Sequence, residues 1–168
     1  MYEALDIARY VINYAADRGN RITNLKLQKI LYYIQGGFLA NGKGPCFHNA
    51  ILCWKHGPVV RNVYNEFSRY ADGPIPPQTT YRKISLVNGR LEAVNKEFDS
   101  KFLDKEDMRL IDHIVDSLLP YGAWELVQKT HEEDPWENAK NYNDEISPKS
   151  IECYFKKNPE RIYGKFDH

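Results

Sequence analysis

A chain of 168 residues with 42% hydrophobic and 27% charged residues has the composition of one globular domain with a real core. Its formal net charge of zero argues against the dense basic surface of a nucleic-acid-binding protein. No apolar run approaches the roughly 20 residues of a membrane span and no secretory leader opens the chain, so we expect a cytoplasmic protein without membrane contact. Its three cysteines are then expected to be reduced thiols.

The charges are unevenly distributed along the chain. Residues 1–70 carry nine Lys and Arg against four Asp and Glu, whereas residues 95–145 carry six against fourteen. Such a division indicates either a charged partner on one face or two halves that attract each other. A merely solvated surface is a third interpretation.

Two helices are predicted before residue 41. Residues 3–17 form the first, which ends near Gly19, a residue suited to the left-handed position after a helix. Residues 23–39 form the second, because apolar side chains recur there with helical spacing: Leu27, Ile30, Leu31, Ile34 and Phe38. Its Gly36-Gly37 pair predicts close packing of another backbone segment. The face beside the apolar stripe carries lysines and tyrosines and is expected to be exposed.

Residues 41–45 break this helix, and residues 50–54 are either a buried strand or an extended loop. Gly57-Pro58 is interpreted as the start of a helix, since proline is tolerated at the first helical position. Asn88-Gly89 predicts a β-hairpin between the strands 83–87 and 90–94. Because two strands alone are marginally stable in water, this hairpin is expected to lie against the helices or to pair with the region of Ile51.

Further helices are predicted after Asp104, Gly122, Asp134 and Ser147, and the polar tail 158–168 is expected to be partly ordered. The predicted fold is therefore mainly α (α+β): a compact bundle of about six helices with one small hairpin at 83–94.

Two groups of residues were considered as catalytic or metal sites. Zinc favours a tetrahedron of thiolate and imidazole ligands, but the spacing of Cys46, His48, Cys53 and His56 matches none of its common patterns. His131, with the carboxylates that follow it, lacks a serine or cysteine nucleophile elbow and a phosphate-binding loop nearby. The sequence therefore predicts no metal, no cofactor and no enzymatic activity.

Aromatic residues make up 13% of the chain, including twelve tyrosines, which is more than a core of this size requires. Tyrosine and arginine are enriched among the residues that dominate binding energy in protein interfaces. This composition favours an interaction surface. The three tryptophans, Trp54, Trp124 and Trp136, are expected to be core residues whose indole N–H finds a partner.

Three segments resemble the motifs of one known family. Residues 25–33, LKLQKILYY, are similar to its signature helix "LKLQKLLYY", with Ile30 in place of a leucine. Residues 54–60, WKHGPVV, followed by Val63-Tyr64, resemble its "AW-x-x-GPV…VY" segment, with Cys53 in place of the alanine. Thr130-His131 and Pro135-Trp136 resemble its "TH…PW" segment. The family is that of the Panacea domain, the SocA-like antitoxins related to phage-associated GepA proteins.

This resemblance covers about residues 3–141 and implies a mainly helical domain at 1–141, which includes the hairpin, with an extension at 142–168 that packs on it or trails from it. It also implies that the chain is the antitoxin of a bacterial or phage toxin–antitoxin system and neutralises a protein toxin by direct binding. Toxins paired with the family include alarmone-synthetase-like enzymes, and one founding member delivers its toxin to a Clp-type protease. The sequence does not indicate the oligomeric state.

We expect the toxin to bind beside the signature motifs, where six side chains fall outside the buried stripes: Lys26, Lys29, Tyr33, His56, Arg61 and Tyr70. The competing interpretation is that the motifs are shared because they build the fold, which leaves partner contacts to the hairpin and the tail. The alternative functions are a DNA-binding regulator and a metal- or histidine-dependent enzyme.

Overall fold

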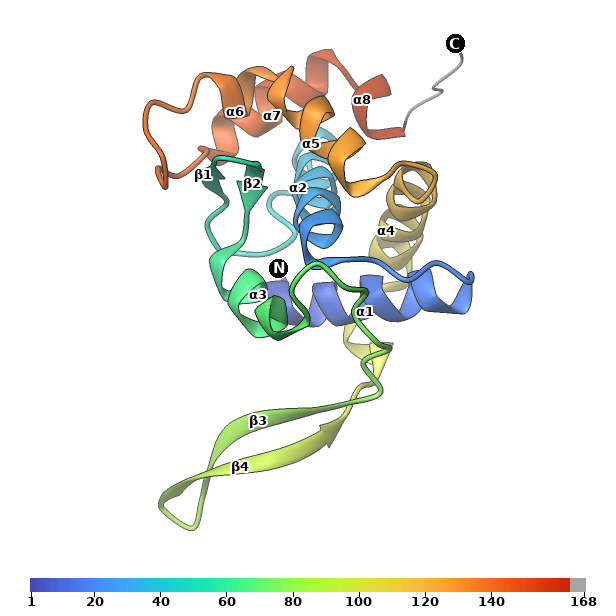
Figure 1. Ribbon diagram of the computed structural model, residues 1–168, viewed down its shortest axis with the longest axis vertical. Helices are drawn as coiled ribbons and strands as arrows, with labels where there is room; N and C mark the ends of the chain where they lie inside the picture. The colour runs from blue at the N-terminus through green and yellow to red at the C-terminus, as the bar shows by residue number, and fades with distance from the viewer. Residues whose placement is uncertain (164–168) are drawn as a thin grey trace.

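The computed structural model describes residues 1–163, which form eight α-helices, two short 3-10 turns and two two-stranded antiparallel sheets (Figure 1). The elements are α1 (Ala4–Asp17), α2 (Asn24–Ala40), β1 (Leu52–Trp54), β2 (Gly57–Val59), α3 (Arg61–Phe67), η1 (Ser68–Tyr70), β3 (Thr80–Val87), β4 (Arg90–Glu97), η2 (Ser100–Phe102), α4 (Lys105–Leu118), α5 (Ala123–His131), α6 (Asp134–Glu137), α7 (Pro148–Lys157) and α8 (Glu160–Tyr163). The prediction of a mainly helical fold is confirmed. None of the helices in residues 1–163 is long and apolar enough to cross a membrane.

Helix α2 runs through the centre of the bundle, with other helices around it (Figure 1). The side chain of Thr23 accepts the backbone amide of Lys26 at 3.3 Å and caps its start. Gly36 and Gly37 permit the close packing predicted from the sequence, but the neighbours are side chains rather than a backbone segment. A Cβ atom at Gly36 would collide with the ring of Phe155 in α7, and one at Gly37 would lie 2.5 Å from Cδ1 of Ile114 in α4.

The apolar stripes of α2 and α3 lie in the hydrophobic core, where Leu31 and Phe67 are both 0% exposed. We expect Leu31→Ala or Phe67→Ala to lower the free energy of unfolding by about 2–5 kcal/mol, because each removes buried methylene or ring carbons and leaves a cavity. Chemical denaturation measures this change. A loss of no more than about 0.5 kcal/mol, which is typical of surface substitutions, would show that these side chains do not support the core.

The acidic second half of the chain pairs with the N-terminal half. Tyr10 and Tyr14 of α1 donate hydrogen bonds to Asp112 and Asp116 of α4, at 2.6 and 2.9 Å. Ion pairs reinforce this contact, since Arg18 lies 3.1 Å from Asp116. The uneven charge distribution is thus used in part inside the molecule, as attraction between its two halves.

Two local predictions were wrong. Gly57-Pro58 does not begin a helix: residues 57–59 form strand β2, which pairs with β1, and α3 begins only at Arg61. The hairpin neither packs along the helices nor pairs with the region of Ile51: within residues 1–163 β3 pairs with β4 alone, and its base touches the bundle where Arg9 lies over the Tyr81 ring. Strands β3 and β4 are longer than predicted and project from the bundle as a free arm (Figure 1). We call residues 80–97 the β3–β4 arm.

The chain after residue 141 packs on both β1 and α2. The amide of Cys53 donates to the carbonyl of Asp144 at 2.8 Å, and the amide of Ile146 donates to that of Ile51 at 2.8 Å. Helix α7 follows, and its Phe155 is buried against α2. The predicted tail 158–168 contributes the short helix α8, while residues 164–168 lie outside the described part of the chain.

Candidate functional site

The first turns of α2 hold the chain that follows β2. Gln28 Oε1 accepts the backbone amide of Val60 at 2.9 Å, and Gln28 Nε2 donates to Asn24 Oδ1 at 2.9 Å. Asn24 Nδ2 in turn donates to the carbonyl of Tyr64 at 2.9 Å. Buried backbone groups require hydrogen-bond partners, so these two amide side chains fix the start of α3 against α2.

Gly57 marks the closest approach between the β1–β2 hairpin and α2. Its φ of +99° is unfavourable for other residues, and a Cβ atom there would lie 2.7 Å from both Lys29 Cε and Thr130 Oγ1. Beneath it, Lys29 Nζ donates to the carbonyl of Pro58 at 3.1 Å. The glycine of the second motif therefore makes room for the lysine of the first.

The third motif also contacts the β1–β2 hairpin. The imidazole of His131 stacks on the indole of Trp136, with ring centroids 3.9 Å apart and planes 17° apart. Trp136 Nε1 donates to the carbonyl of Trp54 at 3.0 Å. Burial, together with the positive charge of Lys29, lowers the pKa of His131 and favours its neutral form. The three motifs thus meet around one hairpin and build the fold there.

A buried ionic cluster lies behind this junction. Glu133 is 0% exposed, and its Oε1 accepts hydrogen bonds from Tyr33 OH at 2.9 Å and Arg161 Nε at 3.0 Å. Lys129 Nζ lies 3.8 Å from the same oxygen and 4.3 Å from the centroid of the Tyr33 ring. Burial raises the pKa of Glu133 and lowers that of Lys129 to about 8. The cluster joins α2, α5 and α8.

Two of the six predicted partner-binding residues are not on the surface. Lys29 and Tyr33 are both 0% exposed, because β2, α5 and α7 cover the face of α2 that was expected to be free. Lys26 is half-buried, and its Nζ donates to the carbonyl of Leu119 at 2.7 Å. Tyr70 is also half-buried. The exposure predicted for Lys29 and Tyr33 was therefore wrong.

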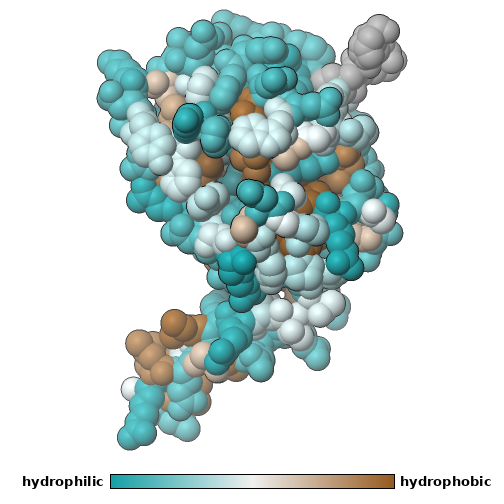
Figure 2. Space-filling view, in the orientation of Figure 1, coloured by the Kyte–Doolittle hydropathy of each residue, from teal (hydrophilic) through white to brown (hydrophobic). Residues whose placement is uncertain are grey.

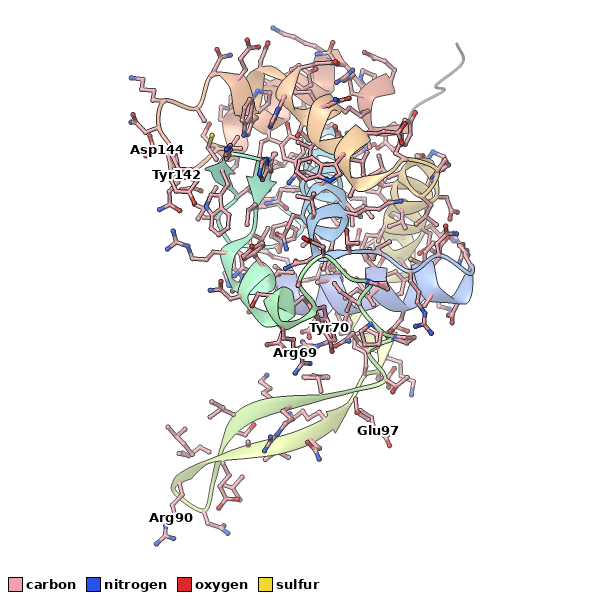
Figure 3. The ribbon with its side chains drawn as sticks, viewed as in Figure 1. Arg69, Tyr70, Arg90, Glu97, Tyr142 and Asp144 are labelled. Carbon is pink, nitrogen blue, oxygen red and sulfur yellow. The ribbon has the colours of Figure 1, made fainter. Side chains whose placement is uncertain are left out.

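His56 is exposed and forms one wall of a groove of about 460 Å³. We define the aromatic groove by five rings that line it: Trp54, His56, Tyr64, Trp124 and Tyr142. The His56 and Trp124 centroids lie 5.0 Å apart, and the Trp54 centroid lies 5.0 Å from that of Tyr64 and 6.1 Å from that of Tyr142. Tyr142 stands at the rim beside the β1–β2 hairpin (Figure 3). Residues of α2 also line the groove: Asn24, Leu25, Gln28 and Lys29.

Arg61 is exposed at the start of α3, on the side of the groove where Tyr142 lies. Its guanidinium donates to Asn143 Oδ1, which also accepts the indole N–H of Trp54 at 3.1 Å. Asn143 has a φ of +73°, so this loop is held in an unusual conformation at the rim. His56 therefore lines the groove itself, whereas Arg61 lines a neighbouring cleft with Leu52 and Asn65 and is linked to Trp54 of the groove through Asn143.

Trp124 was expected in the core but is 59% exposed. Its indole contributes a large apolar surface that is open to solvent next to His56. The sequence contained a signal for this position: Trp124 lies two residues before the buried Leu126, which places the two side chains roughly 200° apart around α5. For Trp54 and Trp136 the expected partner of the indole N–H is present, but both side chains are only half-buried.

The four residues considered as zinc ligands occupy different surroundings. His48 Nε2 lies 3.6 Å from Glu3 Oε1, and His56 stands in the aromatic groove. Burial raises the pKa of the Cys46 thiol, and the buried Cys53 Sγ lies 3.9 Å from the carbonyl oxygen of Trp136. Within residues 1–163, no group of three or more His, Cys, Asp or Glu side chains is arranged to hold a metal ion. The absence of metal and cofactor stays a prediction, which metal analysis of purified protein would test.

Comparisons with known proteins agree with the motifs that meet at this site. The family model described as "Antitoxin SocA-like, Panacea domain" matches residues 27–137, which is more than half of the chain. Antitoxin SocA of Caulobacter vibrioides (strain NA1000 / CB15N) is 39% identical over 72 residues, a stretch that covers 43% of this chain and 37% of that protein. No solved structure matches the chain. The chain belongs to the SocA-like antitoxin family that is defined by the Panacea domain.

Proposed function

We propose that this protein acts as an antitoxin that binds a protein toxin directly, with the aromatic groove as the main contact surface. Family membership supports the antitoxin role. The observation that carries the choice of surface is Trp124, a large side chain left 59% exposed opposite His56, at the junction of the three motifs. Packing of the core does not require this indole, because most of it lies in solvent.

The groove has the physical properties of a binding hot spot. Tryptophan, tyrosine and arginine supply most of the binding energy in protein interfaces, especially where neighbouring side chains exclude water around them. Here aromatic side chains line the groove, and Arg61 lies in the neighbouring cleft, joined through Asn143 to Trp54. A side chain of the toxin that enters the groove would bury apolar surface on several sides. Binding of this kind requires no catalytic group, and we propose that the protein is not an enzyme.

Four predicted residues remain in the proposed contact surface: His56 in the groove, Arg61 at its rim, and the half-buried Lys26 and Tyr70 on the elements nearby. The class of toxin is proposed from the family resemblance, because toxins paired with this family include alarmone-synthetase-like enzymes. Delivery of the bound toxin to a Clp-type protease is a second route to neutralisation. If delivery is the route, protection of cells requires the protease. If the antitoxin only blocks the toxin by binding it, cells are protected without the protease.

The test uses the protein encoded by the open reading frame adjacent to the gene of this chain, co-expressed with wild type or with single variants. We expect Trp124→Ala and Arg61→Glu each to weaken its binding by roughly 1–2 kcal/mol or more and to abolish growth rescue, because they remove exposed hot-spot groups. Their free energies of unfolding should stay within about 0.5 kcal/mol of wild type.

The matched control is Arg109→Glu, which makes the same charge change at an exposed position of α4. It should bind and rescue like wild type. Variants of the groove that rescue growth normally would place the contact surface elsewhere. A wild-type chain that neither binds this protein nor protects cells from it would reject the proposed function.

A further inference from the structure

The β3–β4 arm stands apart from the bundle and exposes apolar side chains along one face (Figures 1 and 2). Asn88 and Gly89 both have positive φ, 50° and 77°, as a tight two-residue hairpin turn requires. Near this turn, Ile84, Leu86 and Leu91 are 70%, 70% and 76% exposed. The register pairs Leu86 with Leu91, so the three side chains share one face. An apolar face of this kind on a free hairpin indicates contact with another molecule.

The hydrogen-bond pattern identifies the free edge of each strand. The amide of Phe98 donates to the carbonyl of Thr79 at 2.8 Å, and these two residues continue the register of the arm. In an antiparallel pair, bonded and non-bonded positions alternate, so the residues directed inward on β3 are 81, 83, 85 and 87. The backbone N–H and C=O groups of Arg82, Ile84 and Leu86 therefore face outward. Ile84 and Leu86 thus carry both outward backbone groups and exposed apolar side chains.

The base of this edge lies beside η1. A cleft of about 330 Å³ there is lined by Glu66 of α3, Arg69 of η1, and Tyr81 and Arg82 of β3, among others. Tyr81 is anchored to the bundle by Arg9, whose guanidinium carbon lies 3.9 Å from the centre of its ring. The edge of β3 thus begins next to α3 and η1, whose other side borders the aromatic groove. Residues 64–72 therefore line the aromatic groove with Tyr64 and Ser68 and this cleft with Glu66 and Arg69. Figure 3 shows Arg69 and Tyr70 between the bundle and the arm.

The charge of this edge is positive. Within residues 1–163, no ion pair involves Arg69, Arg82 or Lys83, whereas Glu66 already lies 3.5 Å from Arg9. An acidic side chain of a ligand placed opposite Arg82 would also lie near Arg69, because both arginines line the same cleft. The complementary ligand is therefore an extended segment with apolar residues at alternate positions and a carboxylate at one end.

We propose that the free edge of β3 receives such a segment of the toxin as an additional β-strand, a second contact beside the aromatic groove. Backbone hydrogen bonds to Arg82, Ile84 and Leu86 would supply affinity, and the apolar and basic side chains would supply specificity. This inference rests on the proposed function, because its ligand is the toxin. The inference extends the proposed function, because it assigns a second contact to strand β3 and specifies β-strand addition as the mode of recognition.

Proline substitution tests the backbone contact. Ile84→Pro removes an outward amide without breaking a bond of the hairpin, and Ile84→Ala is the control that keeps this amide. Ala93→Pro removes an outward amide from β4, the opposite edge. The dissociation constant of each full-length variant is measured by calorimetry with the protein of the adjacent open reading frame. We expect Ile84→Pro to bind at least tenfold more weakly than Ile84→Ala, and Ala93→Pro to bind like wild type.

Equal affinities for Ile84→Pro and Ile84→Ala, or equal losses for Ile84→Pro and Ala93→Pro, would overturn the proposal while leaving toxin binding in place. Light scattering of the antitoxin alone tests the other occupant: a dimer that Ile84→Pro dissociates would assign this edge to a second copy of the chain and also overturn it. Absence of any binding by wild type would instead reject the proposed function, and with it a toxin strand on β3.

Discussion

Lys29→Glu is expected to unfold the protein or to lower its free energy of unfolding by about 3 kcal/mol or more, although a sequence pattern placed this residue on the surface. The side chain is 0% exposed, and its ammonium donates to the carbonyl of Pro58. A carboxylate in the same place would face that carbonyl oxygen as an unpaired buried charge. Thermal and chemical denaturation measure the loss. Stability within about 0.5 kcal/mol of wild type would show that Lys29 is accessible.

The control Lys29→Met keeps the apolar part of the side chain and lacks the titrating amine, so comparison with wild type isolates the pH dependence that Lys29 gives to stability. Burial lowers the pKa of Lys29 to about 7, whereas an unfolded lysine titrates near 10.4. Between these values the unfolded state binds the additional proton, so the stability contributed by this residue rises with pH. Wild type should therefore gain stability relative to Lys29→Met as the pH rises from about 7 to 10. A difference between the two that does not change with pH would contradict a buried, titrating lysine.

Glu133→Ala is expected to lower the free energy of unfolding by about 3–5 kcal/mol, because it leaves buried positive and polar groups without their acceptor. Tyr33 and Arg161 both donate to its carboxylate, and Lys129 lies nearby. Chemical denaturation at neutral pH measures this loss. Glu132→Ala serves as the control, since Glu132 is 71% exposed and its contact with Arg161 is 3.5 Å long.

Glu132→Ala should change stability by no more than about 0.5 kcal/mol, as is usual for exposed ion pairs. Glu133→Gln, which keeps an oxygen acceptor but not the charge, should fall between the two. Equal and small effects of all three variants would mean that the ionic cluster does not hold α8 and α5 to α2.

The helices could be predicted because their signals are local. Thr23, Asp104 and Ser147 cap the helices that follow them, each accepting a backbone amide at the expected turn. The apolar stripes of α2 and α4 also agree with the core. The start of α3 could not be predicted in this way, because Gly57-Pro58 has the local form of a helix start. Residues 57–59 form a strand instead, held by Lys29 at the carbonyl of Pro58 and by Gln28 at the amide of Val60, and both partners are distant in sequence.

The candidate site was predicted only in part, for a physical reason. Periodicity divides a helix into an apolar and a polar face and assumes that the polar face meets water. Helix α2 is instead covered on all sides, and its polar residues bind the backbone of β2 and α3. His56 lies in the turn between β1 and β2, and Arg61 is the first residue of the short helix α3. Both side chains are exposed there. The domain boundary at 141 stays a prediction.

The β3–β4 arm was expected to be packed against the protein, but it is exposed. Asn88-Gly89 identified the turn correctly, but the rule that two strands need support suggested packing against the helices. The exposed face of Ile84 and Leu86 instead projects from the bundle. Sequence alone does not distinguish a hairpin that covers the protein's own core from one that covers a partner, because both require the same alternating apolar side chains.

Hydrogen exchange of the purified complex tests most directly whether the aromatic groove contacts the toxin. The free chain and its complex with the protein of the adjacent open reading frame are compared by mass spectrometry. We expect binding to slow exchange in the segments that carry the groove, 54–64, 123–126 and 141–144. Slowed exchange confined to α1, α4 or α8, with these three segments unchanged, would contradict this expectation.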